Sequence, residues 1–499
     1  MILLGIIFTG CVFRFSFPGA IPNGLFCDEA ARGYDAYSIL NTLRDHNGDF
    51  LPLFTRAFGE FPPSTYTFLA VPAVAIFGLN EFAVRLPAAV AGVLTILAAY
   101  WLVKECFNRK TALVAALFLA VSPWHIQFSR TAFECILFPL CFVSGVLFFV
   151  KAFKREPNYL ILSALMFGVS LHTYFAARVF VPLFMTGLVV IFREFLWEHR
   201  KRSLISFIVF MSIFTVLLVF WLSPGGTSRA QAVGLTFDLK RIFLNYLKYF
   251  SPSYLFLSGD ANLRHSILNT GQLHFLGLWT IPAGIAGVVL GLKKKTHRIF
   301  LLWLILYPIP AALTTEGAPH AIRSIIGAPL FPVFSAVGCF VLLGLFRRRI
   351  AKAIFISGIS LIFLFNVAGY AKSYFYDYPK YSTGWWQHGM REAVEYAENS
   401  RYKNVILSDK FNQGYIFLLF YAEYLPSRYQ LGLKQGGKYS FGKYRVGSIE
   451  RPIKVDTPVL FILRPDEMKK IPKGYEGRVV HVVRDPRGYA EMVLVEIRA

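Results

Sequence analysis

Long apolar runs separated by short polar segments occupy residues 1–371 of the chain. An apolar helix of about 20 residues is long enough to cross the hydrocarbon core of a membrane. Lys and Arg collect in the loops on the cytoplasmic side of such helices. Five basic clusters mark these loops, at residues 104–110, 151–155, 193–202, 293–298 and 347–352.

Two membrane crossings fit between each pair of neighbouring clusters. The turns between them, at residues 122–131, 172–178, 223–271 and 316–323, are expected on the outer side. With a first span that starts in the cytoplasm, the pattern predicts about eleven spans and places the C-terminus outside. They lie near residues 1–17, 85–104, 111–122, 133–150, 159–173, 177–192, 204–222, 272–292, 299–314, 323–346 and 353–371.

Residues 63–79 form a further apolar stretch that this topology does not use as a span. If they crossed the membrane, every later basic cluster would move to the outer side, against the charge rule. We therefore expect them to lie along the interface or to dip in and return. Residues 18–84 then form one long outer loop.

The composition changes after Lys372. Apolar runs shorten to the length of strands at residues 405–408, 458–463, 479–483 and 492–497, with helical patterns at 385–397 and 413–424. The predicted fold class is an all-α polytopic membrane domain, residues 1–371, followed by a small α/β domain, residues 372–499. The topology places this second domain outside the cell membrane and the N-terminus in the cytoplasm.

Charged residues make up only 16% of the 499 residues, and hydrophobic residues make up 55%. Soluble domains carry roughly 25% charged residues, so lipid must cover the apolar surface of this chain. The net charge of +23 falls mainly in the loop clusters, so it indicates membrane topology and no nucleic-acid partner. The six cysteines include no C-x-x-C pair, and we expect neither a disulfide framework nor a zinc site.

Acidic residues are scarce in the apolar region and concentrate in the first outer loop. Asp28 and Glu29 follow the turn-forming Pro22-Asn23-Gly24 and precede a helical pattern over residues 30–43. Both carboxylates then lie at a helix N-terminus near the membrane surface. They could cap that helix, where acidic side chains are stabilising, or they could carry chemistry.

The residues around this acidic pair form an ordered series of short motifs that covers about the first 180 residues. The motifs are Asp28-Glu29; Tyr34, Leu40 and Gly48-Asp49; Glu60-Phe61-Pro62-Pro63 with Tyr66; Phe77-Gly78; and Glu81-Phe82-Ala83-Val84-Arg85-Leu86-Pro87. The series resembles the extracytoplasmic transferases of the GT-C fold, notably the protein O-mannosyltransferase and aminoarabinose transferase families. Aminoarabinose transferases carry a Lys before the Pro-Pro of one motif, thought to meet the lipid phosphate, and Phe61 stands there in this chain.

The resemblance implies a membrane glycosyltransferase that takes its sugar from a dolichyl- or polyprenyl-phosphate carrier. The acceptor would be a protein, a lipid or a cell-envelope glycan on the outer face. Direct inverting displacement at the anomeric carbon needs a base, and Asp28 is the predicted catalytic base. Glu29 would orient Asp28, bind the acceptor or cap the helix. A monophosphate donor needs no divalent metal and no Asp-x-Asp occurs, so we expect no required metal and no cofactor.

Side chains at the outer turns are the expected contacts for the donor and the acceptor. Guanidinium groups suit the departing phosphate because they stay ionised and bind it in bidentate fashion. Each such Arg could instead reach from a helix end to the interface, and His320 could be structural. Glu134 could contact a substrate or pair with Arg130, four residues earlier. The predicted substrate-binding residues are Glu60, Tyr66, Arg130, Glu134, Tyr174, Arg178, His320 and Arg323.

Three other classes of protein compete with this hypothesis. A multi-pass transporter or flippase usually places ionisable residues near mid-membrane in paired halves, and this chain shows neither feature. A structural membrane subunit would not need the acidic first loop. An oligosaccharyltransferase, which shares the fold, carries W-W-D ahead of its soluble domain, whereas this chain has Trp385-Trp386-Gln387. The sequence names neither the sugar nor the acceptor.

Overall fold

The computed structural model describes residues 1–223, 225–450, 457–471 and 476–498. The chain forms two compact units. The first comprises residues 1–16, 59–65 and 88–374, and the second comprises residues 17–58, 66–87 and 375–499. The last boundary between the units, after residue 374, lies three residues beyond the predicted boundary after residue 371, and residues 17–58 and 66–87 group with the C-terminal region. The division into two domains at that boundary stays a prediction.

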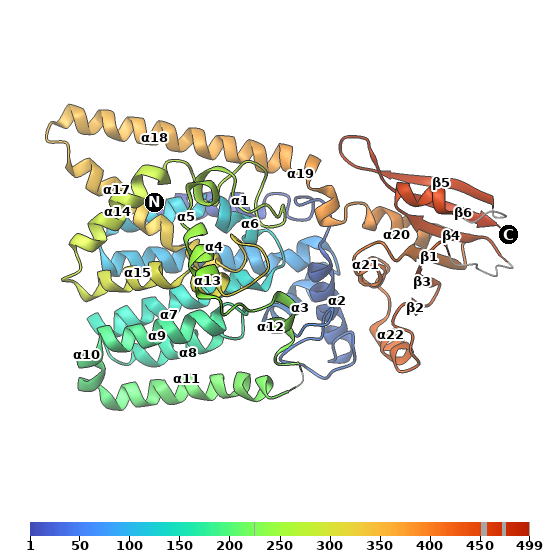
Figure 1. Cartoon of the computed structure of the whole chain (residues 1–499), viewed down its shortest axis with the longest axis horizontal. Helices are drawn as coiled ribbons and strands as arrows, with labels where there is room; N and C mark the ends of the chain where they lie inside the picture. The colour runs from blue at the N-terminus through green and yellow to red at the C-terminus, as the bar shows by residue number, and fades with distance from the viewer. Residues whose placement is uncertain (224, 451–456, 472–475, 499) are drawn as a thin grey trace. The chain divides into compact units, whose positions relative to one another are not determined.

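Helices build the first unit, where many of them run side by side (Figure 1). A helix overlaps every predicted span. α4 (Glu81–Cys106) belongs to both units, and the others here are α1 (Ile2–Phe15), α5 (Arg109–Ala120), α6 (Pro123–Ser129), α7 (Leu137–Lys154), α8 (Tyr159–Ser170), α9 (Ala177–Ile191), α10 (Arg193–Glu198), α11 (Arg200–Trp221), α12 (Ser228–Val233), α13 (Leu239–Lys248), α14 (Gly277–Leu290), α15 (Lys295–Leu306), α16 (Ile309–Ala312), α17 (Leu330–Gly344) and α18 (Arg349–Lys372).

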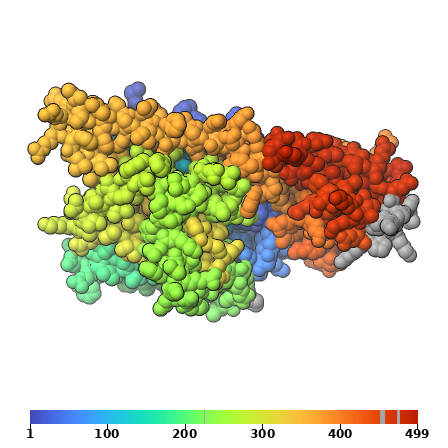
Figure 2. Space-filling model, turned by 45° about the horizontal axis from the view of Figure 1, so that its top comes forward, coloured from blue at the N-terminus to red at the C-terminus, as the bar shows by residue number. Residues whose placement is uncertain are grey.

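Several of these helices fit a membrane. Among the described residues, five helical segments are long and apolar enough to cross, or six if the bent pair α5 and α6 is one span. Figure 2 shows α18 as an orange ridge on the surface of the first unit, and its apolar side chains, such as Ile350 and Phe365, are exposed. Such a helix is typical of contact with lipid. The prediction of a membrane protein with several spans is confirmed, while the number of about eleven and the orientation stay predictions.

Close backbone contact joins α14 to α17. A Cβ atom at Gly284 would lie 1.8 Å from the Phe334 carbonyl oxygen, and one at Gly338 would lie 1.8 Å from the Thr280 carbonyl oxygen. Small residues let membrane helices approach in this way, because apolar burial alone does not drive association within lipid. These two glycines therefore fix the approach of two helices of the bundle.

The apolar stretch at residues 63–79 contains α3 (Thr65–Phe77), a helix of 13 residues. At about 1.5 Å per residue it is roughly 20 Å long. The hydrocarbon core of a bilayer is about 30 Å thick, so α3 alone is shorter than that core. α1, α8, α9 and α14, which lie in predicted spans, have similar lengths, so the placement of residues 63–79 along the interface stays a prediction.

A six-stranded sheet lies in the second unit, in the order β2-β3-β1-β4-β6-β5. β1 pairs in parallel with β3 and β4, whereas β6 pairs antiparallel with β4 and β5. The four predicted strands are confirmed, and β2 and β3 were not predicted. The strands are β1 (Asn404–Ser408), β2 (Ser440–Phe441), β3 (Tyr444–Gly447), β4 (Val459–Leu463), β5 (Glu476–Arg484) and β6 (Ala490–Arg498).

The helix that carries the acidic pair, α2 (Cys27–Thr42), packs within this second unit against α21 (Gly414–Tyr421) and α22 (Pro426–Leu433). A Cβ atom at Gly33 would lie 2.5 Å from the Phe420 ring, so α2 can approach α21 only with glycine there. The Tyr34 hydroxyl donates to the Tyr424 carbonyl oxygen at 2.6 Å. α20 (Met390–Asn399) and α21 match predicted helical patterns, while α22 was not predicted.

A buried ion pair fixes the start of α2. Arg85 and Glu29 are both fully buried, and the guanidinium Nε lies 2.9 Å from Glu29 Oε1. Arg85 makes five hydrogen bonds, two to Glu29 and one each to the carbonyl oxygens of Pro18, Pro22 and Gly24. A guanidinium group has five N–H donors, so Glu29 and the turn before α2 together satisfy all of them.

We predict that Arg85→Met destabilises the protein by about 3–5 kcal/mol, because it leaves a buried carboxylate and three carbonyl groups without their donor. The measurement is the midpoint of thermal unfolding of the detergent-purified chain. Arg56→Met is the matched control, since Arg56 forms an exposed pair with Asp49 at 3.0 Å. Such surface pairs contribute about 0–1 kcal/mol. Equal midpoints for the two variants would contradict the assignment.

Candidate functional site

Asp28 and Glu29, at the N-terminus of α2, make different contacts. Glu29 Oε2 accepts a hydrogen bond from the Phe26 backbone N–H at 3.0 Å, and Glu29 also pairs with Arg85. Glu29 therefore caps the helix and fixes the turn before it, which favours the structural alternative for this residue. The Asp28 side chain is half-buried, and its Oδ1 lies 3.8 Å from Cys27 Sγ, a weak contact. Asp28 thus keeps a carboxylate that can reach solvent.

Two other predicted site residues, Tyr66 and Arg130, make structural contacts, and their roles toward a substrate stay predictions. Tyr66 is fully buried, and its hydroxyl donates to the Val84 carbonyl oxygen at 2.9 Å, which ties α3 to α4. Arg130 is fully buried and donates to the carbonyl oxygens of Phe13 and Ser16, both at 2.7 Å. Carbonyl groups at a helix C-terminus attract cations, so Arg130 caps the end of α1.

A pair of arginines and an aromatic ring form a charged cluster in the first unit. Arg229 Nη1 lies 2.6 Å from Glu60 Oε1 and 2.8 Å from Glu60 Oε2. The Arg229 guanidinium carbon lies 5.3 Å from the centre of the Phe175 ring, and that of Arg178 lies 4.6 Å from the same ring. Cation–π contacts of this kind hold a guanidinium group in place without using its N–H donors.

Glu134 and Tyr174 complete this cluster. Burial raises the pKa of the Tyr174 hydroxyl, the charges of Arg229 and Arg323 oppose that shift, and the charge of Glu134 adds to it. The Glu134 charge also acts on Arg178 and Arg229. We call Glu60, Glu134, Tyr174, Phe175, Arg178 and Arg229 the arginine cluster.

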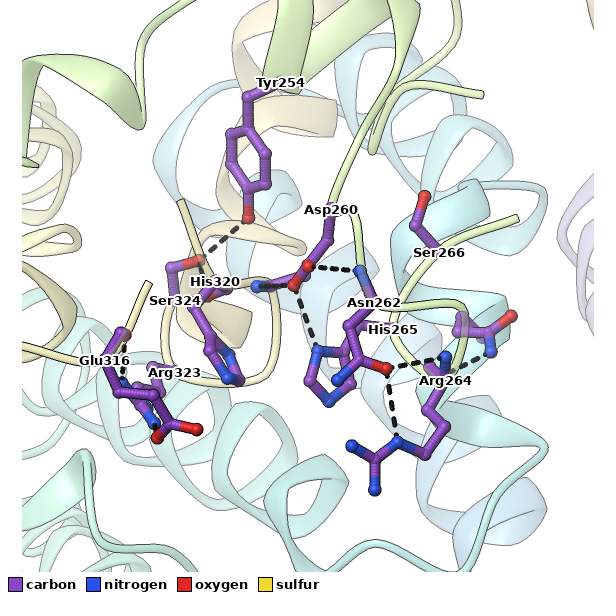
Figure 3. Close-up of polar contacts among 12 residues, drawn as sticks. Tyr254, Asp260, Asn262, Arg264, His265, Ser266, Glu316, His320, Arg323 and Ser324 are labelled. Atoms are coloured by element: carbon purple, nitrogen blue, oxygen red, sulfur yellow. Dashed lines mark hydrogen bonds and ion pairs between the residues drawn. The ribbon is translucent and has the colours of Figure 1, made fainter. Parts of the chain in front are cut away.

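Arg323 lies in the loop before α17. It donates to Thr314 Oγ1 at 2.7 Å and to the Glu316 carbonyl oxygen at 2.9 Å, and it forms an ion pair with the Glu316 carboxylate. These contacts hold the loop of residues 314–323 around one guanidinium group, as Figure 3 shows. Arg323 thus has a local structural role, and its charge still reaches Tyr174.

His320 lies beside two residues from a different loop (Figure 3). The His265 and His320 ring centres are 4.6 Å apart, and His265 Nδ1 lies 3.0 Å from Asp260 Oδ2. Burial raises the pKa of Asp260, but the hydrogen bond and charge of His265 bring it below its ordinary value overall. Burial and the charges of His265 and Arg323 lower the pKa of His320. The group is therefore an ionised carboxylate beside imidazole rings.

The predicted site residues fall into both units. Asp28, Glu29 and Tyr66 belong to the second unit, and the first unit holds the others, of which the arginine cluster joins Glu60, Glu134, Tyr174 and Arg178. The sequence analysis missed Arg229, Asp260 and His265. Arg229 follows Gly225-Gly226 in the loop of residues 223–271, which holds several other basic residues, so nothing in the sequence singles it out. Its partner, Glu60, is 169 positions away.

Comparison with known proteins bears on this arrangement. Residues 62–222 match the family described as dolichyl-phosphate-mannose-protein mannosyltransferase. The putative mannosyltransferase YkcB of Bacillus subtilis (strain 168) is 24% identical over 201 residues, which cover 39% of this chain and 27% of that protein. The chain thus matches only about a quarter of the length of this curated relative.

Solved structures match nearly the whole chain. ArnT from Cupriavidus metallidurans in the apo state aligns with 99% of this chain and 97% of its own, with a TM-score of 0.62 and 14% identity. The same protein bound to undecaprenyl phosphate gives a TM-score of 0.62 at 13% identity. The oligosaccharyltransferase AglB from Archaeoglobus fulgidus aligns with 84% of this chain and 63% of its own, with a TM-score of 0.56 and 15% identity. The chain therefore has the GT-C fold of these membrane proteins, and its residues 62–222 are similar to the mannosyltransferase family.

Proposed function

We propose that this protein is a membrane glycosyltransferase that moves a sugar from a polyprenyl-phosphate carrier to an acceptor on the outer face of the membrane. The observation that carries the proposal is the arginine cluster, which gathers two guanidinium groups around Phe175 in a chain of the GT-C fold. Arg178 is buried at the start of α9, and Arg229 is half-buried beside it over the same ring. A cation at the boundary of a membrane helix is costly unless it is paired or functional. A lipid phosphate is the ligand that suits these two guanidinium groups.

Arg229 is the central donor-binding residue in this proposal. Only Nη1 of its guanidinium group is used in the pair with Glu60, although such a group offers five N–H donors. Aminoarabinose transferases place a Lys where this chain has Phe61, and the Phe61 ring packs 6.2 Å from that of Phe220. Arg229 supplies a cation beside Glu60 in its place. Undecaprenyl phosphate bound to ArnT supports a lipid phosphate as the donor class.

Asp28 is the proposed base. The acceptor hydroxyl oxygen attacks the anomeric carbon while the bond from that carbon to the phosphate oxygen breaks. The hydroxyl proton passes to the Asp28 carboxylate, and polyprenyl phosphate leaves with the electron pair of the broken bond. This inverting displacement needs a carboxylate that is not fully committed to structure, and Asp28, unlike Glu29, meets that condition.

The proposal includes a topology. The N-terminus is cytoplasmic, residues 372–499 are extracytoplasmic, and the C-terminal part of the second unit helps select the acceptor. The packing of α2 against α21 and α22 supports the last point, because it joins the helix of the proposed base to the C-terminal region.

We predict that Asp28→Asn lowers the rate of sugar transfer by about 10²–10⁴-fold, the usual contribution of a positioned general base. The measurement is polyprenyl phosphate released from a panel of polyprenyl-phosphate sugars by the detergent-purified protein, with cell-envelope acceptors added. Asp238→Asn is the matched control, because Asp238 caps α13 through the backbone N–H of Lys240 and asparagine caps helices equally well.

Two results would count against this mechanism. Asp28→Asn with the activity of Asp238→Asn would remove Asp28 as the base. Wild-type protein that releases no polyprenyl phosphate with any donor and acceptor would count against transfer itself and favour the multi-pass transporter or flippase, which a flux assay in liposomes would then test.

A second prediction concerns the donor. Arg229→Gln should raise the KM for the lipid donor about tenfold to a hundredfold, because a hydrogen bond to a charged group contributes about 1.5–3 kcal/mol. Adding Glu60→Gln should restore folding stability but not donor affinity, since it removes the unpaired carboxylate without replacing the cation. Arg241→Gln, in the same outer loop and exposed, is the control. An unchanged KM in Arg229→Gln would exclude Arg229 from donor binding.

A further inference from the structure

The cluster of Asp260, His265 and His320 has the composition and geometry of a metal site. One ligand atom from each residue lies within 4.8 Å of the others. Zn²⁺ prefers imidazole nitrogen and carboxylate oxygen at about 2.0–2.2 Å, which puts tetrahedral ligands roughly 3.3 Å apart. His265 Nδ1 and Asp260 Oδ2 are already 3.0 Å apart, close to that spacing.

Backbone groups hold the carboxylate in place. Asp260 Oδ2 accepts the Ala321 N–H at 2.7 Å, and Asp260 Oδ1 accepts the Asn262 N–H at 2.9 Å. Hydrogen bonds from outside the ligand set are a regular feature of metal sites, where they orient the ligands. Asp260 and His265 are buried, so the carboxylate and ring have little freedom to turn away.

Asp260 and His265 form a hydrogen bond with each other, whereas the His320 ring contacts His265 through its face and leaves a nitrogen unsatisfied. His320 Nδ1 is buried and has no hydrogen-bond partner among the described residues. A buried polar atom without a partner costs about 1–3 kcal/mol. The neighbouring Ser324 hydroxyl donates to the His320 carbonyl oxygen at 3.0 Å, which fixes the backbone of His320 and leaves its ring to find another partner.

We infer that Asp260, His265 and His320 bind a Zn²⁺ ion that joins the loop of residues 258–272 to the loop of residues 314–324. Three protein ligands leave a fourth position, which water would fill. His320 and Arg323 share one loop, so the ion would hold in place the backbone from which Arg323 extends. The site goes beyond the proposed transfer reaction, and its test does not need a substrate.

The full chain, purified in detergent and stripped with a chelator, is equilibrated with Zn²⁺ and its metal content is measured by mass spectrometry. Wild type should retain about one zinc per chain. His265→Ala and His320→Ala should each bind zinc at least about a hundredfold more weakly, because loss of a ligand exceeds the tenfold to hundredfold cost of losing an outer contact. His481→Ala is the control, since His481 forms a two-residue pair with Glu392 at 2.6 Å and should leave the zinc content unchanged.

Thermal unfolding supplies a second readout that a merely structural triad would not move. Zn²⁺ should raise the unfolding midpoint of wild type and of His481→Ala, because a ligand that binds only the folded state stabilises it. The midpoint of His320→Ala should not respond to Zn²⁺, whatever its starting value. Wild type with no zinc above the chelator-treated background, or zinc content unaffected by both substitutions, would overturn the inference.

Discussion

Pairing of buried guanidinium groups is the constraint on which much of this structure depends. Arg14, Arg85 and Arg130 are fully buried in a chain that is mostly apolar. Arg14 donates to the Gly10 and Ala120 carbonyl oxygens, at 3.0 and 2.8 Å, and contacts His125 at 2.7 Å. Since an unpaired buried charge is far more costly than a lost hydrogen bond, each arginine requires the surrounding turns to face it.

The same constraint separates structural arginines from those available for binding. Arg85 directs three donors at backbone carbonyl groups and two at Glu29, and Arg130 donates to the carbonyl oxygens of Phe13 and Ser16, so both fix helix ends. Arg229 directs one nitrogen at Glu60 and lies over Phe175. A guanidinium group that directs one nitrogen at a carboxylate keeps other N–H groups for a ligand, whereas Arg85 uses all five of its donors. The partners of an arginine, more than its place in an outer turn, therefore indicate its role.

The helices of the first unit could be predicted because their signal is local. Apolar length and basic clusters located a helix for each expected span, and short apolar runs located β1, β4, β5 and β6. β3 (Tyr444–Gly447) was not predicted because it is only four residues long and has just two apolar residues, Tyr444 and Val446, separated by Arg445. The grouping of residues 17–58 with the C-terminal region depends on contacts across hundreds of positions, such as Tyr34 with Tyr424, which no local pattern contains.

The candidate site could be predicted only where one motif carries it. Asp28 and Glu29 are adjacent, and the motif series marked them, but only the structure distinguishes a committed carboxylate from an available one. Asp260, His265 and His320 come from two loops, so their spacing has no metal pattern. The expectation of no required metal rested on the monophosphate donor and on the absence of such a pattern, and neither argument addresses a cluster that only the fold brings together.

At 13–15% identity the solved structures and this chain share a backbone fold, but most of their side chains differ. The chemistry of the site therefore depends on individual side chains. Phe61 stands where aminoarabinose transferases have a Lys, yet Glu60 still has a cation beside it, because Arg229 reaches it from another loop. Arginine binds phosphate through a planar fork and lysine through a point charge, so the exchange alters how a donor is oriented even if its phosphate is retained. The position of the sugar relative to a base follows from that orientation. A different donor sugar is therefore the consequence we expect from this exchange, within an unchanged fold.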